Sequence, residues 1–340
     1  MPKSRPYLWS FGFLFAAMTL SVVIGSVLIP LSTLGRMFLH HISSVGQTDW
    51  PAAYETIVFQ VRLPHMVLVL LTGAGLGGSG AAYQGLFRNP LADPYLIGVA
   101  SGAGLGAVIA MALRWPVDVL GFFTIPAFAF FGALLTVMVV YVLAQVNRTL
   151  PTTTLILAGV AVSSFTTAAT SFLLLASANE LYRALSWLLG GGTIGGWSPV
   201  GAMLPYILVG LGYLITTGHQ LNVLQFGDEQ AHQLGIPVER VKRLILVAAT
   251  LTTAAAVAFS GLIGFIGLIV PHMVRIVYGP DYRHLVPLSI IGGGVALLLA
   301  DAVARSILAP QTLPVGIITA LAGAPFFLWI LRTAKSNIHW

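Results

Sequence analysis

The sequence predicts an all-α integral membrane protein with about ten transmembrane helices and with both termini in the cytoplasm. Of its 340 residues, 57% are hydrophobic and only 8% are charged, whereas soluble domains carry roughly 25% charged residues. The apolar segments are long enough to cross a hydrocarbon core of ~30 Å as helices, which satisfy their backbone hydrogen bonds internally. We therefore expect a single transmembrane domain over residues 1–340.

Cutting the chain at its polar segments gives ten expected spans of about 15–27 residues each. Their approximate limits are 8–29, 63–84, 95–113, 119–145, 152–176, 199–218, 244–260, 262–277, 285–305 and 314–331. The first span follows Lys3 and Arg5 and lacks a clear small-x-small cleavage site, which favours a retained helix over a signal peptide. Pro271 falls within the eighth span, where we expect it to kink or shorten the helix.

The basic residues orient these spans. With the N-terminus in the cytoplasm, residues 219–243 and the C-terminus are also cytoplasmic, and most of the 16 Lys and Arg lie inside, as the positive-inside rule expects. The basic residues that then face outwards are Arg36, Arg62, Arg114, Arg183 and Arg305. Membrane orientation thus explains the net charge of +6, and we expect the lipid bilayer, not nucleic acid, as the partner of these charges.

The 37 glycines cluster inside the expected spans, as in residues 73–80, 98–107 and 291–296. Helix association in lipid depends on close backbone approach, so these runs predict helix–helix contacts. Residues 73–80 also match the spacing of a dinucleotide-binding fingerprint, but no strand pattern precedes them, and we reject that interpretation.

The longest polar segment of the chain is residues 219–243. Its charged residues are Asp228, Glu229, Glu239, Arg240, Lys242 and Arg243. The run DEQAHQLG predicts a short helix that ends at Gly235, and Pro237 is expected to open a second short helix. Such an element cannot lie in lipid, so we interpret it as a docking surface for a soluble partner. The alternative is an ordinary solvated loop.

The chain carries no set of residues typical of an enzyme. It has no cysteine, no GxxxxGK[ST] motif and no HExxH motif, so we expect neither a catalytic site nor a metal site nor a cofactor in this chain. No expected span has a charge near its centre, where ion-coupled carriers place one. Asp301 comes nearest, and an i,i+4 ion pair with Arg305 is the alternative to a functional role. An ion-coupled carrier that works without an ATPase is the alternative function.

Four segments together resemble the FecCD family, the membrane permeases of bacterial ABC importers for cobalamin, haem and ferric siderophores. They are residues 61–107, which begin VRLPHM, residues 155–164 (LILAGVAVSS), residues 234–275 and residues 297–331. The resemblance covers nearly the whole chain. It implies the type II ABC importer permease fold, a multi-pass location in the bacterial inner or cytoplasmic membrane, and movement of a metal chelate into the cytoplasm by alternating access.

The resemblance also implies partners. They are two ATP-binding-cassette ATPase subunits, which would hold ATP and Mg, a periplasmic or lipid-anchored substrate-binding protein, and a second permease copy in a homodimer. A heterodimer with a different permease is the alternative within the family. Which chelate is carried stays open at this point.

Finally, the resemblance assigns roles to single positions. The family's coupling helices, which rest on the ATPase, match Gly227, Asp228, Glu229, Ala231, His232, Leu234 and Gly235. Positions that dock the binding protein match Arg62 and Arg305, with His65 where a related permease has a second arginine. The cytoplasmic gate and the pathway match Asn89, Leu91, Thr152, Thr153, Ser163 and Ser164.

Overall fold

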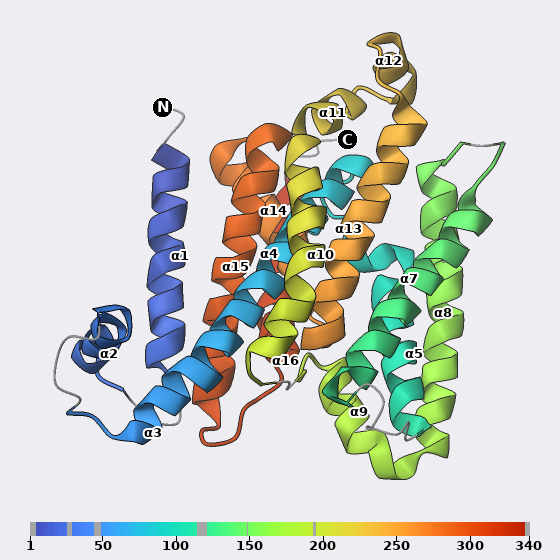
Figure 1. The fold of residues 1–340 in the computed structure, drawn as a ribbon. Coiled ribbons are helices and arrows are strands. Elements are labelled where there is room, and N and C mark those ends of the chain that lie inside the picture. The colour runs from blue at the N-terminus through green and yellow to red at the C-terminus, as the bar shows by residue number, and fades with distance from the viewer. Residues whose placement is uncertain are drawn as a thin grey trace.

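The protein is a bundle of long helices in the computed structural model, which describes residues 5–25, 29–43, 49–113, 121–147, 149–192 and 195–336 (Figure 1). Among these residues, seven helices are long and apolar enough to cross a membrane, and three shorter apolar helices join them. The long ones are α1 (Arg5–Val23), α4 (Leu63–Leu86), α7 (Thr124–Ala144), α8 (Thr152–Ala176), α10 (Trp197–Thr216), α13 (Val238–Ser260) and α15 (Tyr282–Ile307). The shorter ones are α5 (Val99–Ala112), α14 (Ile266–Tyr278) and α16 (Val315–Ser336). The expected all-helical fold is thus confirmed. Arg114, one of the arginines predicted to face outwards, lies outside the described residues.

Short helices lie at the two ends of the bundle (Figure 1). One end carries α2 (Leu31–Ser43), α3 (Ala52–Glu55), which continues through the π-helix η1 (Thr56–Arg62) into α4, and α9 (Leu181–Leu188) after η4 (Ala178–Glu180). The other end carries α11 (Gly218–Leu224) and α12 (Asp228–Gln233). The 3-10 helices η2 (Pro94–Ile97) and η3 (Gly121–Phe123) precede α5 and α7. The start of α1 and the end of α16 share the end with α12, as predicted from the charges.

Most expected span limits differ from the structure by a few residues, and two differ by more. The first span ends at Val23 instead of near residue 29, and the seventh begins at Val238 instead of 244. The expected second short helix after Pro237 is therefore wrong, because Pro237 opens the long helix α13. The first turns of α13 are charged and the rest of the helix is apolar. The change from charged to apolar residues at 244 therefore lies within the helix and is not its start.

The central contact of the bundle is between α4 and α15, and α4 also packs on α13 and α14. A Cβ at Gly73 would lie 2.3 Å from the carbonyl oxygen of Gly293, and one at Gly80 would lie 2.0 Å from that of Gly267. Both distances are far shorter than a carbon–oxygen contact allows, so these backbones touch only because glycine has no side chain. The expected glycine contacts are therefore confirmed for residues 73–80 on α4 and 291–296 on α15, and Gly267 on α14 adds one that was not predicted.

We predict that Gly80→Ala destabilises the protein by about 1–3 kcal/mol or more, because overpacking forces the backbone of α14 to move. The matched control is Gly212→Ala on the exposed face of α10, where nothing lies within 4 Å of an added Cβ. Melting temperatures of the two purified variants in detergent test this. Equal melting temperatures would contradict the backbone contact between α4 and α14.

Candidate functional site

The polar segment 219–243 forms most of α11, all of α12 and the first turns of α13 at the inner end of the bundle (Figure 1). Gly227 precedes α12 with φ 107°, and Gly235 follows it with φ 84°, a region that glycine adopts without steric cost. The backbone N–H groups of Gly235 and Ile236 donate to the carbonyls of His232 and Ala231, each at 3.0 Å. This pattern is a Schellman motif, so the predicted helix stop at Gly235 is confirmed with its cause.

The side chains of α12 divide into an anchoring face and an exposed face. Ala231 is fully buried, whereas Glu229 and His232 are exposed. Two large apolar side chains flank the helix and face solvent, Phe226 with 69% of its surface exposed and Leu234 with 65%. A hollow of about 490 Å³ runs beside α12 and the start of α13. An ordered helix with exposed apolar side chains and an adjacent hollow is typical of a protein-binding surface.

Hydrogen bonds fix α11 to the inner ends of two spans. Asn222 donates to the carboxylate of Asp281 at 2.7 Å and accepts from the N–H of Tyr282 at 2.9 Å. Gln225 donates to the carbonyl of Gly85, near the end of α4, at 2.9 Å. Asp281 also caps α15, and the hydrogen bonds from Arg283 hold the pKa of its carboxyl well below the usual range. The element is therefore fastened to α4 and α15.

At the outer end of the bundle, Arg62 and Arg305 bind the end of α1. Arg62 is only 7% exposed, and its guanidinium donates to the carbonyls of Val22 at 2.7 Å and Val23 at 3.1 Å. Arg305 donates to the carbonyls of Ile24 at 2.9 Å and Ser21 at 3.1 Å. The last carbonyls of a helix lack partners within the helix and carry partial negative charge. The two arginines therefore cap α1, and their docking role stays a prediction.

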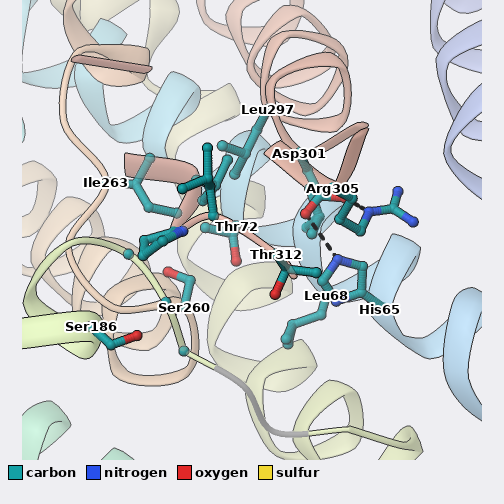
Figure 2. A pocket seen from close by; sticks show the side chains of 17 residues that line it. His65, Leu68, Thr72, Ser186, Ser260, Ile263, Leu297, Asp301, Arg305 and Thr312 are labelled. Atoms are coloured by element: carbon teal, nitrogen blue, oxygen red, sulfur yellow. Dashed lines mark hydrogen bonds and ion pairs between the residues drawn. The ribbon is translucent and has the colours of Figure 1, made fainter. Parts of the chain in front are cut away.

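His65 and Arg305 share the carboxylate of Asp301 (Figure 2). His65 Nε2 lies 2.9 Å from Asp301 Oδ1, and Arg305 Nε donates to Asp301 Oδ2 at 2.8 Å. The i,i+4 pair considered from the sequence is thus present. Asp301 is 5% exposed, and a buried carboxylate is tolerated only when it is paired. The cluster lies near the outer end of α15, away from the middle of the span.

A cavity of about 140 Å³ adjoins this cluster. His65, Asp301 and Arg305 form one side, and Ser186, Ser260 and Thr312 contribute hydroxyl groups elsewhere in its wall (Figure 2). The buried hydroxyl of Thr72 also lines it and has no hydrogen-bond partner among the described residues. The cavity has room and polar partners for several water molecules, and it is far too small for a chelate such as cobalamin or haem.

The predicted gate residues Asn89 and Leu91 lie on the connection that follows α4. Asn89 is exposed, and its side-chain oxygen accepts from the N–H of Leu91 at 2.9 Å, which fixes a tight turn. Asp93 caps η2 by accepting from the N–H of Tyr95 at 2.8 Å, and burial raises the pKa of Asp93 to about 6. Tyr95 Oη bonds both the N–H and the C=O of Ile263. The connection is therefore held to the loop between α13 and α14.

The other two predicted gate residues, Thr152 and Thr153, and the predicted pathway residues Ser163 and Ser164 lie along α8. Thr152 and Thr153 are in its first turn, at the same end of the bundle as α12, and Thr153 is exposed (Figure 1). Ser163 is half-buried beside Gly98, which follows η2. Ser164 is exposed and donates to the carbonyl of Val160 at 2.9 Å. The structure thus joins α8 to the gate connection through η2, and the gate and pathway roles stay predictions.

Several polar residues of these sites were missed from the sequence. They are Arg88, Asn222, Gln225, Lys242 and Asp281 at the inner end, and Asp301 in its pairing with His65 at the outer end. Lys242 carried a signal that could have been used, because a lysine within a mostly apolar helix needs a partner. The other pairings join residues far apart in the chain, and no local pattern marks them.

Within the described residues, the helical membrane bundle carries an ordered helix with exposed apolar side chains and has no charged side chain near the middle of its spans. These features are typical of a membrane protein that works with a separate soluble partner. Comparison with known proteins agrees. The profile described as FecCD transport family matches residues 13–333. The chain therefore belongs to the FecCD transport family, and it is the non-catalytic, multi-pass permease subunit of an ABC importer.

Individual relatives match along nearly their whole length. The ABC transporter permease protein YvrB of Bacillus subtilis (strain 168) is 43% identical over 328 residues, which cover 96% of this chain and 92% of YvrB. The cobalamin import system permease protein BtuC of Halobacterium salinarum is 47% identical, covering 89% of this chain and 85% of BtuC. The hemin transport system permease protein HmuU of Yersinia pestis is 37% identical over an alignment that covers 92% of this chain and 95% of HmuU.

A solved structure supports the fold. It shows an inward-facing conformation of a transporter described as metal-chelate type, with 28% sequence identity and a TM-score of 0.81. The match covers 96% of this chain and 98% of that chain. The expected type II ABC importer permease fold is thus confirmed.

We predict that Asp301→Ala destabilises the permease by about 3–5 kcal/mol, because it leaves Arg305 and His65 without their shared carboxylate. The matched control is Asp49→Ala, which breaks a pair with Arg36 in which both side chains are about half exposed and which is worth about 0–1 kcal/mol. Thermal unfolding of both variants in nanodiscs measures the difference. Similar melting temperatures would show that the buried cluster does not hold α1 and α15 together.

Proposed function

We propose that this permease moves a metal chelate (cobalamin, haem or a ferric siderophore) from a substrate-binding protein into the cytoplasm by alternating access. The relatives named for cobalamin and hemin transport support this cargo class. Two ATPase subunits with bound ATP and Mg supply the energy. The permease has no need of a tight cargo site, because the binding protein supplies the affinity.

The observation that carries the proposal is the ordered, exposed helix α12. Its Schellman motif and the buried Ala231 keep it rigid, while Phe226 and Leu234 are left exposed for a partner. A solvated loop would have neither a fixed cap nor a buried anchor. We assign the contact with the ATPase to the coupling-helix positions Gly227, Asp228, Glu229, His232, Leu234 and Gly235, with the buried Ala231 anchoring the helix from behind.

A second copy of the chain completes the conduit in this proposal. α8 exposes Phe165, Phe172 and Leu175, each by more than two thirds, together with small and hydroxyl side chains. A face of that kind suits a smooth wall at a two-fold axis, where Ser163 and Ser164 would line the path. Asn89, Leu91, Thr152 and Thr153 would close it at the cytoplasmic end. A homodimer is the simplest assembly that gives a path wide enough for a chelate.

The assembled complex provides the test of this function. Co-expressed with its ATPase and reconstituted in liposomes, the permease is expected to take up at least one of cobalamin, haem and a ferric siderophore only when ATP and the binding protein are present. Deleting residues 228–235 is expected to abolish uptake, because it removes the contact through which the ATPase would move the permease. Uptake that needs an ion gradient but no ATP, or uptake that survives the deletion, would contradict the proposal.

We further predict that Arg62→Gln combined with Arg305→Gln weakens binding-protein affinity about tenfold, because charged hydrogen bonds at a docking rim guide association. Glutamine still offers N–H donors to the carbonyls at the end of α1, so the variant preserves part of the cap. Arg36→Gln, which removes an outer guanidinium paired with Asp49, is the control and should change affinity little. Titration of the binding protein onto immobilised permease gives the measurement; an unchanged affinity in the double variant would leave these arginines with the capping role alone.

A further inference from the structure

We propose that Asp228 transmits the movement of α12 to the cytoplasmic gate, through ion pairs with Lys242 on α13 and Arg88 after α4. This inference rests on the proposed function, because it concerns how force from an ATPase reaches the conduit. It gives Asp228 a role inside the permease, whereas the resemblance placed it only at the contact with the ATPase.

The link between Asp228 and Lys242 is short, and its lysine is buried, whereas 43% of the Asp228 side chain is exposed. Lys242 is 3% exposed, and its Nζ donates to Asp228 Oδ2 at 2.5 Å. An ammonium group so poorly hydrated must be neutralised by a neighbouring carboxylate, and Asp228 is the one in contact with it. α12 is therefore fixed to the first turns of α13 and must move with that helix.

The link between Asp228 and Arg88 is longer. Arg88 Nη2 lies 3.7 Å from Asp228 Oδ1, and this oxygen is buried without a hydrogen-bond partner among the described residues. Arg88 has φ 51°, and Gly227 has φ 107°; a Cβ on Gly227 would lie 3.5 Å from Arg88 Nη1. Two left-handed residues thus bring the end of α4 and the start of α12 together. The geometry leaves room for a hydrogen bond that forms when the two segments approach.

Arg88 precedes the predicted gate directly. Asn89 is the next residue, and its side chain fixes the turn that holds Leu91. A displacement of Arg88 by its carboxylate partner would therefore change the position of that turn. The short ion pair binds Asp228 tightly to Lys242 on α13, and the longer one leaves its distance to Arg88 variable. Asp228 can therefore move together with α13 and change the position of the connection that follows α4.

The test compares Asp228→Asn, Arg88→Gln and the double variant in the reconstituted complex, with uptake and ATP hydrolysis measured in the same vesicles. Asp228→Asn and Arg88→Gln should each lower the number of cargo molecules moved per ATP by about fivefold or more, in the range of typical coupling energies. The double variant should be no worse than Asp228→Asn, because both changes break one pathway. Arg332→Gln, an exposed arginine at the inner end of α16, is the control and should match the wild type.

Binding of the ATPase to the permease is measured in parallel, and melting temperatures show whether each variant folds. Unchanged ATPase affinity in Arg88→Gln, with reduced cargo per ATP, supports the transmission role, because Arg88 lies outside the assigned ATPase contact. Reduced ATPase affinity in Asp228→Asn with wild-type behaviour of Arg88→Gln would overturn it, as would additive losses in the double variant. A wild-type complex without ATP-driven uptake would instead refute the proposed function, so the two failures are distinguishable.

Discussion

The direct contact of glycine backbones along α4 is the constraint on which the rest of the structure depends. In lipid, helices gain nothing from burying apolar surface against one another, so association requires close packing. At Gly73 and Gly80 that packing is so close that no side chain fits between α4 and its neighbours α15 and α14. The backbones of α14 and α15 therefore fix α4 at both of these positions, and we expect α4 to move as a rigid helix.

α4 connects the outer and inner ends of the bundle. At its outer end, Arg62 directly precedes α4 and reaches the end of α1, and His65 in its first turn reaches the carboxylate of Asp301. At its inner end it leads to Arg88 and the gate connection. A shift at one end of a rigid helix appears at the other, and packed interfaces tend to switch between discrete arrangements instead of bending. In the proposed function, binding-protein docking outside and ATPase contact inside would thus act on the same helix.

The sequence predicted the features that depend on composition and local pattern. Span number, orientation, the glycine contacts and the stop of α12 at Gly235 follow from hydropathy, charge and residue type. The ends of α1 and α13 were misplaced, because apolar residues continue past one helix and charged residues lie within the other. Helix limits depend on caps and tertiary contacts, which hydropathy does not record.

Residues of the candidate site could be proposed from the sequence, but the contacts between them could not. Arg305 reaches the carbonyl of Ile24 across 281 positions, and His65 meets Asp301 across 236. Backbone carbonyls at a helix end have no residue signature, so no local sequence pattern predicts that Arg62 and Arg305 donate hydrogen bonds to the end of α1. The Asp228–Lys242 pair, 14 positions apart, escapes the i,i+4 rule because the turn at Gly235 brings α12 back against α13.

The placement of charge explains how so tightly packed a protein can still move. A charge at the centre of a span costs roughly 2.5–3.5 kcal/mol, and the ion pairs of the described residues lie at the two ends instead. Partly exposed ion pairs such as Arg88–Asp228 exchange partners at low cost, whereas the buried pair of Asp301 with Arg305 and the glycine backbone contacts each keep a single arrangement. The helices around α4 are therefore expected to shift as rigid groups while the polar contacts at their ends rearrange. In such a mechanism specificity for the cargo has no reason to lie in the spans, which is consistent with a smooth, uncharged α8.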